Sequence, residues 1–237
     1  MRAAAIAAAI AVALLLSACV GDDALVERTE SLGAFGVVDV LVPLAVTLEE
    51  GAAASITASG PADAVEALDF VVENGRLSIR TVYGGEWLSP KRPSVTLHLV
   101  APPLRQFNVY EGARLTTVTP VTAADFEVAF RGKVGEADVD FAGGRFGYFN
   151  NGATAGRLTV RGAAERLDVR NIALATVEAG GLRARVAEVY NASRGDVVVQ
   201  VTDTLRVEIG GAGDVVLFGT PVVEEIPGGG GGRLRRG

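Results

Sequence analysis

Apolar and polar residues alternate along most of this chain. Residues 38–42, 77–82 and 95–100 each place an apolar side chain at every second position. A period of two is typical of β-strands that have one buried face and one exposed face. Only residues 62–68 have the pattern of a helical turn or two. The pattern therefore predicts an all-β protein.

From residue 107 onward the alternation recurs with a period of about 20 residues. The copies start at Phe107, Phe126, Phe146, Leu167, Ala187 and Leu205. In each copy apolar columns alternate with polar ones, and the copy ends in a turn rich in glycine or asparagine, residues that tolerate positive φ. A unit of this length cannot bury its own apolar face, but stacked copies can.

The repeat predicts a β-solenoid, a parallel β-helix whose coils fill residues 106–237 and stack like residues into ladders of Phe, Val and Asn. Residues 31–105 are expected to supply N-terminal strands that cap it, because an open terminal coil would associate edge to edge. The alternative is an antiparallel β-sandwich, which also has short strands at such spacings. We favour the solenoid because a sandwich gives no reason for like residues to recur column by column.

The first 19 residues predict export and a lipid anchor. Arg2 precedes an apolar run over residues 3–16 and then Ser17-Ala18-Cys19, which is typical of a signal peptide and too short for a membrane span. Residues 16–19 resemble the lipobox of bacterial lipoproteins, and this implies cleavage before Cys19 and lipidation of its sulfur. The alternative is an ordinary signal peptide with an incidental cysteine.

We therefore predict a lipoprotein signal peptide over residues 1–18, a lipidated tether over 19–30 and a single β domain over 31–237. Cys19 is the only cysteine, so the chain forms no internal disulfide. In the sorting pattern of such lipoproteins an Asp after the cysteine retains the protein in the inner membrane. Val20 occupies that place and favours an outer membrane lipoprotein that faces the periplasm or the surface.

The net charge of −6 argues against a nucleic-acid partner, which requires a basic stripe. The membrane is the expected partner through the lipid anchor, because two or three acyl chains hold a protein stably on a bilayer.

Two segments, residues 205–221 and 97–107, resemble the bacterial family described as "putative auto-transporter adhesin, head GIN domain". The resemblance extends over roughly residues 31–235. It implies a right-handed parallel β-helix on a lipoprotein, and the family name implies adhesion. Ala153 and Ile172 stand in turns where the family usually has glycine, so the middle coils are expected to be irregular.

The sequence offers little for catalysis, and we predict no catalytic residue, metal or cofactor. His98, the only histidine, falls on the polar side of a strand. Glu136, Asp138 and Asp140 share one face of a strand and could bind Ca²⁺ or act as a carboxylate pair. Either use needs ligands from several coils, so we favour a solvated acidic face.

Residues 194–196 read Arg-Gly-Asp, a tripeptide that adhesion receptors recognise in some proteins. In the repeat, Gly195 and Asp196 fall on Gly213 and Asp214, and Arg194 falls on Ala212. We therefore interpret the tripeptide as turn architecture, with Gly195 expected at positive φ.

One outward column carries aromatic residues, and we take Tyr110, Phe149 and Tyr190 as candidate binding residues. Aromatic side chains in line on a rigid sheet suit sugar rings or a partner's strand. The alternative is that the N-terminal strands cover these aromatics, and the sequence does not decide between the two. The predicted function is a lipid-anchored binding or scaffolding protein of the cell envelope, adhesive in one reading, with a polysaccharide or protein partner. The alternative is a carbohydrate-active enzyme, a polysaccharide lyase or hydrolase, on a β-helix.

Overall fold

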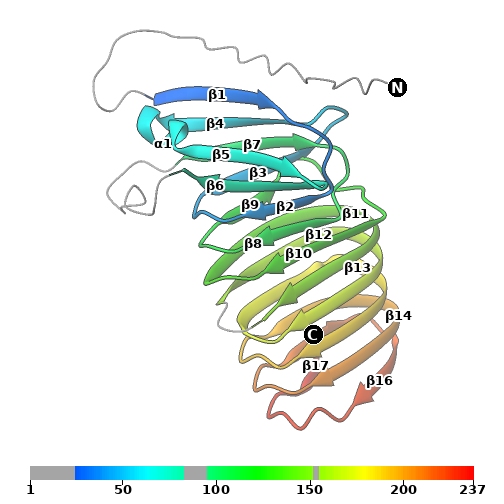
Figure 1. Cartoon of the computed structure of the whole chain (residues 1–237). Helices are drawn as coiled ribbons and strands as arrows, with labels where there is room; N and C mark the ends of the chain where they lie inside the picture. The colour runs from blue at the N-terminus through cyan, green and yellow to red at the C-terminus, as the bar shows by residue number, and fades with distance from the viewer. Residues whose placement is uncertain (1–24, 83–94, 152–154) are drawn as a thin grey trace, which may run out of the picture.

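The computed structural model describes residues 25–82, 95–151 and 155–237 (Figure 1). Cys19, the predicted signal peptide and the turn at Ala153 lie outside these residues. The elements of the described chain, in order, are β1 (Leu25–Ser31), β2 (Val37–Val40), β3 (Ala45–Glu50), β4 (Ser55–Pro61), α1 (Ala62–Glu66), β5 (Leu68–Glu73), β6 (Arg76–Thr81), β7 (Thr96–Ala101), β8 (Gln106–Val109), β9 (Arg114–Thr117), β10 (Asp125–Phe130), β11 (Val134–Asn150), β12 (Ala155–Asn171), β13 (Leu174–Asn191), β14 (Val197–Ile209), β15 (Val215–Phe218), β16 (Val222–Ile226) and β17 (Leu234–Arg236).

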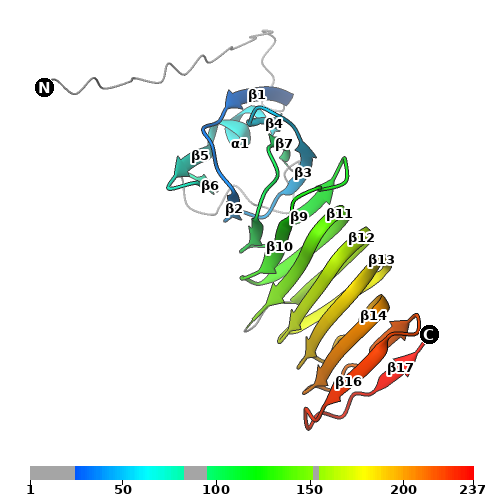
Figure 2. The same cartoon turned by 90° about the vertical axis from the view of Figure 1, so that its right-hand side faces the viewer.

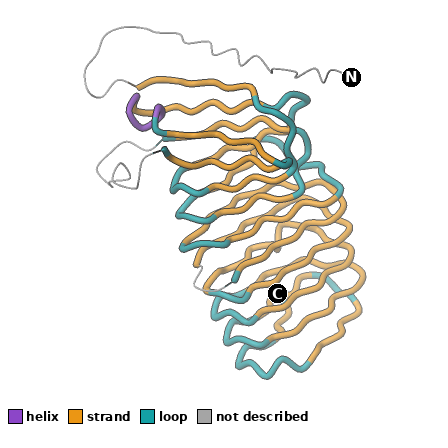
Figure 3. The backbone as a smooth tube through the Cα atoms, in the orientation of Figure 1, coloured by secondary structure: helices purple, strands orange, loops and turns teal. Residues whose placement is uncertain are grey.

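The chain forms the parallel β-helix that its repeat predicts, with about six turns. Strands β10 to β15 pair in parallel with the coil before and the coil after, and β16 and β17 pair in parallel with the coil before. The sandwich alternative is therefore wrong. Each of β11 to β14 bends through a corner and contributes to both sheets of the coil. Figure 3 shows this corner as continuous strand and the opposite corner as a loop.

The two sheets of the solenoid are called face 1 and face 2 here. Face 1 runs in the order β5, β6, β2, β8, β10, the C-terminal halves of β11 to β14, and β16. Face 2 runs β1, β4, β7, β3, β9, the N-terminal halves of β11 to β14, β15 and β17. Figure 2 shows the coils stacked from β9 down to β16.

The predicted register holds for five of the six copies. Phe126 pairs with Phe146, and Leu167 pairs with Ala187. The first copy is shifted by two residues, because Phe107 pairs with Val128 instead of Phe126. A shift of two keeps every side chain on its own face of the strand, so the alternation could not reveal it.

The solenoid begins earlier than residue 106. Strands β2 and β3 stack in parallel on β8 and β9 and so form a coil of their own. The other edges of β2 and β3 pair with β6 and β7, and antiparallel β5, β4 and β1 complete the end. Helix α1, at the predicted helical turn, buries Ala64 and Val65 at this end. Residues 31–105 therefore hold both a coil and a cap.

Strand β1 lies where a polar tether was expected, so that prediction is wrong from Leu25 onward. β1 pairs with β4 along its whole length. Only Val26 packs on the core; on the same side of the strand, Arg28 lies 4.9 Å from the ring centre of Phe70 and donates hydrogen bonds to the carbonyls of Val65 and Leu68. A charged residue thus fills a position that the apolar pattern would assign to a hydrophobic one.

Inward columns form the core that sequence alternation predicts. Aromatic rings gather in the coil of β10 and β11, where Phe130 meets Tyr148 edge-on with 5.3 Å between ring centres. The following coils hold mainly Val, Leu and Ala. Large rings near the cap and smaller aliphatic side chains beyond it keep the interior filled along the stack.

A ladder of three buried asparagines lines the loop corner, as predicted. Asn150 Nδ2 donates to Asn171 Oδ1 at 2.9 Å, and Asn171 Nδ2 donates to Asn191 Oδ1 at 3.1 Å. Asn150 Oδ1 also accepts from the backbone N–H groups of Ile172 and Ala173. Side-chain bonds of this kind hold the turn in place, which explains how a turn with Ile172 instead of glycine is accommodated.

The Arg-Gly-Asp tripeptide belongs to the turn, as the repeat predicts. Asp196 Oδ1 accepts from the backbone N–H of Asp214 at 2.8 Å. The expected positive φ at Gly195 is wrong, because that residue is not among those with positive φ. Glycine is required by close approach instead, since an added Cβ would lie 2.1 Å from the carbonyl oxygen of Ala175 in the coil above.

Candidate binding surface on face 1

An outward column on face 1 brings two of the three predicted aromatics together. Phe149, Arg170, Tyr190 and Glu208 pair in succession on neighbouring coils, about 4.8 Å apart. Tyr110 is not in this column. Because of the register shift its place is held by Asn108, while Tyr110 follows the end of β8 and its backbone N–H donates to the carbonyl of Val40.

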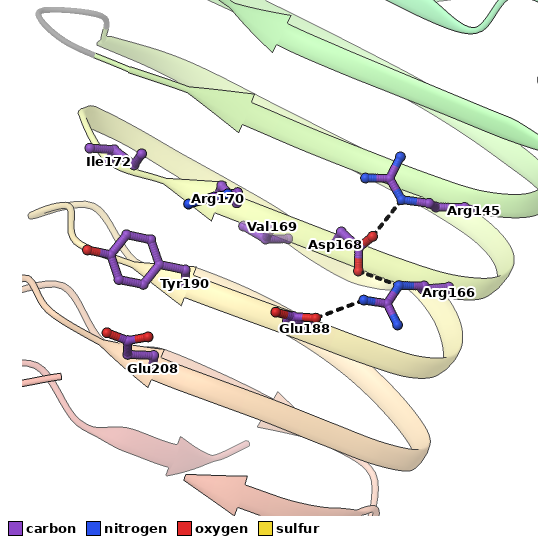
Figure 4. A pocket seen from close by; sticks show the side chains of 9 residues that line it. All are labelled: Arg145, Arg166, Asp168, Val169, Arg170, Ile172, Glu188, Tyr190 and Glu208. Carbon is purple, nitrogen blue, oxygen red and sulfur yellow. Dashed lines mark hydrogen bonds and ion pairs between the residues drawn. The ribbon is translucent and has the colours of Figure 1, made fainter. Parts of the chain in front are cut away.

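A hollow of about 640 Å³ lies over this part of face 1 (Figure 4). Its lining residues come from β11 to β14 and the turn after β12, and they are Arg145, Arg166, Asp168, Val169, Arg170, Ile172, Glu188, Tyr190 and Glu208. A second hollow of about 110 Å³ shares Tyr190 and Glu208 and reaches Ile226 on β16. The concave surface therefore follows the outward column toward the C-terminal coil.

Gly147 helps to form the hollow. It occupies the outward position next to Asp168 on the adjacent strand, and without a side chain it leaves that position open. The guanidinium of Arg145 lies over it, 3.1 Å from where a Cβ would be. A side chain at this position would crowd the Arg145 guanidinium, which would have to shift slightly.

The side of the hollow near the strand corner is a closed network of charges. Asp168, the least exposed member, contacts Arg145 and also Arg166, whose Nε lies 2.7 Å from Asp168 Oδ1. Arg145 also reaches Asp125 at 2.8 Å, and Arg166 reaches Glu188 at 2.8 Å. Figure 4 shows both arginines turned toward the one carboxylate.

The network keeps these arginines charged. Partial burial alone would lower the pKa of Arg145, but its hydrogen bonds to Asp168 and Asp125 outweigh that and raise the pKa. The contact with Asp168 likewise raises the pKa of Arg166. The positive and negative groups here are engaged with one another, although Asp168 Oδ1 has an ion-pair contact to Arg166 and no hydrogen bond. This side therefore offers little free charge to a ligand.

The other side of the hollow is unsatisfied. Within the described ranges, neither the guanidinium of Arg170 nor the carboxylate of Glu208 has an ion-pair partner, and the Tyr190 hydroxyl makes no hydrogen bond. Figure 4 shows Tyr190 between the strands that carry Arg170 and Glu208. A flat ring beside a free cation and a free anion can stack on a ligand ring and hydrogen-bond its polar substituents.

The family described as "Putative auto-transporter adhesin, head GIN domain" matches residues 34–221. The chain belongs to this family. Head GIN proteins of this description are taken to be adhesins, which indicates an adhesive or binding role at the cell envelope. A search of curated proteins found no match.

Solved structures share the head GIN fold of this chain at low identity. A protein of Bacteroides fragilis described as a putative adhesin superposes with a TM-score of 0.78 at 15% identity, covering 90% of this chain and 97% of its own. Two Parabacteroides distasonis proteins each give a TM-score of 0.65. One, a putative adhesin, is 14% identical over 92% of this chain and 98% of its own. The other, a putative lipid binding protein, is 16% identical over 90% and 96%. These likenesses show the fold.

The acidic strand face of this head GIN chain lies on face 2, away from the hollow. Arg161 on the next strand donates to Asp138 at 2.7 Å and lies 3.6 Å from Asp140, while Arg114 contacts Glu136. These carboxylates stay about half exposed. The acidic strand face that was predicted to be solvated is thus partly exposed and also salt-bridged, because arginines on the neighbouring strands contact its carboxylates.

His98 lies on β7 and is half-buried. Its Nδ1 is 3.1 Å from Thr47 Oγ1, and its Nε2 is 3.2 Å from Glu49. In residues 25–82, 95–151 and 155–237 no cluster of three or more His, Cys, Asp or Glu side chains is arranged to hold a metal ion. The same stretch contains no helix of the length and apolarity that a membrane crossing needs.

The predicted aromatic column and the hollow lie on the same face, but of the three predicted aromatics only Tyr190 lines the hollow. Arg170 and Glu208 lie in the same column as Phe149 and Tyr190. Phe149 itself does not line the hollow, and Arg131 covers its ring at 5.3 Å. The available signal was the change of residue type along one column, from aromatic to cationic to aromatic to anionic.

Proposed function

We propose that this chain is a lipid-anchored, non-catalytic binding protein of the outer membrane, and that the hollow on face 1 binds an envelope polysaccharide. The single observation that carries the ligand assignment is the set of Arg170, Tyr190 and Glu208, whose polar groups have no partners in the described chain. The ring of Tyr190 would stack on a sugar ring, and the two charged groups would hydrogen-bond its hydroxyls.

The environment of the carboxylates supports binding over glycoside cleavage. A hydrolase of the usual kind needs two carboxyl groups that flank one bond with room for its substrate. Asp168 and Glu188 are engaged by arginines, so only Glu208 has a free carboxylate among the lining residues. A polysaccharide would therefore be held and not cut.

The anchor rests on the sequence around Cys19. Replacing Cys19 with alanine should abolish incorporation of labelled fatty acid and move the protein from the membrane pellet to the soluble fraction, because the variant lacks the sulfur that carries the proposed anchor. Unchanged fractionation and labelling of Cys19→Ala would contradict the anchor.

Polysaccharide binding is tested with the chain from residue 20 to 237 on an array of neutral and acidic bacterial polysaccharides, followed by titration of the best ligand. Tyr190→Ala should weaken binding about tenfold or more, the equivalent of roughly 1.4 kcal/mol. Tyr110→Ala is the matched control, since it removes the same side chain outside the column and should leave Kd unchanged. Equal affinity of wild type and Tyr190→Ala, or no polysaccharide binding at all, would refute the proposal.

A further inference from the structure

The two ends of the solenoid are finished differently. The N-terminal end has antiparallel strands and helix α1, whereas the other end is the bare coil of β16 and β17 (Figure 2). Among the described residues, 25–82, 95–151 and 155–237, β16 pairs only with β14 and β17 only with β15. Their outer edges therefore carry backbone N–H and C=O groups without strand partners, which is the usual template for adding another strand.

Charged residues stand at core positions of this terminal coil. Glu225 follows Val207 in an inward column of face 1, and Arg236 follows Leu217 in an inward column of face 2. The positions above them are fully buried valines and leucines, but both charged residues are exposed. The inward columns of Val207 and Leu217 thus end in an anion and a cation, beside the apolar Val223 and Leu234.

These two charges lack ionic partners, unlike their outward neighbours. Arg235 contacts Asp214 at 2.7 Å, and Glu224 lies 4.0 Å from Arg206. Arg236 donates only to the carbonyl of Gly219, and Glu225 has no hydrogen bond or ion pair within the described residues. An anion and a cation without ionic partners therefore lie on the terminal coil, both of them exposed.

The charge pattern selects one arrangement of two copies. β16 and β17 lie on opposite faces of one coil and run in opposite directions. A two-fold axis in the end plane, parallel to the strands, sets β16 against the second copy's β17 as antiparallel neighbours. A two-fold axis perpendicular to the faces would instead set β16 against β16 and bring like charges together.

The positions of the two residues fit the first axis. Glu225 continues the middle of the three inward columns of face 1, those of Leu205, Val207 and Ile209. Arg236 likewise continues the middle column of face 2, that of Val199 and Leu217. An axis parallel to the strands keeps the middle columns aligned, so each Glu225 meets the second copy's Arg236.

We propose that two copies of this chain associate end to end through the β16–β17 coil, with Glu225 of each copy paired to Arg236 of the other. The partly buried Val223 and Leu234, which already pack on the core, add apolar contact at the same junction. The assembly closes at two copies because the two-fold contact covers the C-terminal coil of each copy and leaves only the two capped N-terminal ends outside.

This arrangement has a consequence for adhesion, which rests on the proposed lipid anchor. β1 and β17 lie at opposite ends of face 2 (Figure 1). In the proposed dimer the two β1 ends therefore point away from each other. Copies anchored through their N-termini in two facing membranes could then join at their free ends. Self-association would bridge the membranes directly.

The test measures the dimer by analytical ultracentrifugation of the chain from residue 20 to 237 over a range of concentrations. Glu225→Arg and Arg236→Glu each place like charges at both contacts, so each variant alone should raise the dimer Kd about tenfold or more. An equimolar mixture of the two variants restores opposite charges at both contacts and should form a heterodimer as tight as the wild type. Glu178→Arg and Arg183→Glu, charge reversals on β13 away from the end, are matched controls that should change nothing.

Several results would overturn the proposal. These are a wild type that stays monomeric at every concentration, a mixture that fails to restore association, and open-ended oligomers that ignore the reversals. Tighter association of Glu225→Val/Arg236→Leu than of wild type would show that the two charges keep ends apart. Thermal unfolding of each variant checks that it is folded. If one of the single variants does not fold, the double variant Glu225→Arg/Arg236→Glu still tests the pairing, because it should dimerise like wild type.

Membrane bridging is tested separately with phosphatidylcholine vesicles that contain a nickel-chelating lipid and hold the chain by an N-terminal histidine tag. Vesicles with wild type should cluster, vesicles with either reversal should not, and the two variant populations should cluster only with each other. Dimers in solution without vesicle clustering would overturn the bridging role alone. Polysaccharide binding is measured independently, so failure at the hollow and failure at the terminal coil are distinguishable.

Discussion

Replacing Asn171 with alanine tests whether the asparagine ladder holds the coils together. Asn171 is fully buried and stands in the middle of the ladder. It accepts from Asn150 and donates to Asn191 and to the carbonyl of Ala175, at 2.9, 3.1 and 2.8 Å. Asn150 and Asn191 are fully buried as well, so a partner that loses Asn171 is left without an exposed route to a replacement bond.

The magnitude follows from what each partner retains. Asn191 Oδ1 still receives the backbone N–H of Ser193, and the Ala175 carbonyl still receives the Ser193 hydroxyl at 3.4 Å. The Asn150 amide loses the acceptor of its ladder bond. One buried group left unsatisfied costs about 1–3 kcal/mol, and the weakened bonds and the small cavity add to it. We expect a loss of about 3 kcal/mol in the free energy of unfolding.

The assay is urea unfolding followed by circular dichroism, with the slope m checked for constancy. Arg170→Ala is the control, since it changes the adjacent exposed residue and should stay within about 0.5 kcal/mol of wild type. A loss below about 1 kcal/mol for Asn171→Ala, or one no larger than that of Arg170→Ala, would refute the view that the ladder stabilises the stack.

Two further predictions concern the turn and the aromatic core. Gly195→Val should lower the melting temperature clearly, because its Cβ would lie 2.1 Å from the carbonyl oxygen of Ala175. Arg194→Ala should change neither the stability of the protein nor the adhesion of cells to immobilised protein. If Arg194→Ala loses adhesion and Gly195→Val keeps its melting temperature, the tripeptide is a recognition signal instead. Burial raises the pKa of the Tyr148 hydroxyl well above its ordinary value, so the unfolded chain loses this proton at lower pH than the folded chain, and stability should fall as pH rises above about 10. Tyr148→Phe should reduce this loss of stability between pH 8 and pH 11, measured by urea unfolding. If the variant loses as much stability as wild type between the two pH values, Tyr148 is not the cause.

The coils could be predicted from the sequence because each coil buries and stacks the same kinds of residue at the same positions. A parallel stack brings each residue beside its equivalent in the next copy, so Phe126 over Phe146 and Asn171 over Asn191 are visible as columns. The shift at Phe107 was invisible because two residues is the period of the strand itself. The register of β8 against β10 depends on how the two strands pair, and it cannot be seen in Phe107 itself.

The ends and the hollow could not be read in the same way. At β1, Arg28 fills an inward place by stacking on Phe70, and no apolar period records such a contact. The hollow depends on Gly147 and on two arginines that share Asp168. Those residues come from adjacent coils, and their side-chain directions follow from charge and space at the surface.

The inward columns of this fold are constrained by packing in the core, whereas the outward columns are not. The residues that determine function are therefore to be sought first in the outward columns. The inward columns need only apolar residues and asparagines in phase, which is why structures with 14–16% identity share the fold. The outward columns are free of that demand, so a family name that follows the fold does not fix what face 1 binds. In this chain the outward column carries Arg170, Tyr190 and Glu208 without partners, and the terminal coil carries Glu225 and Arg236 at positions where the fold alone would place valine or leucine. Departures from the repeat that bring no internal contact are the residues to mutate first, because stability gives no reason for them.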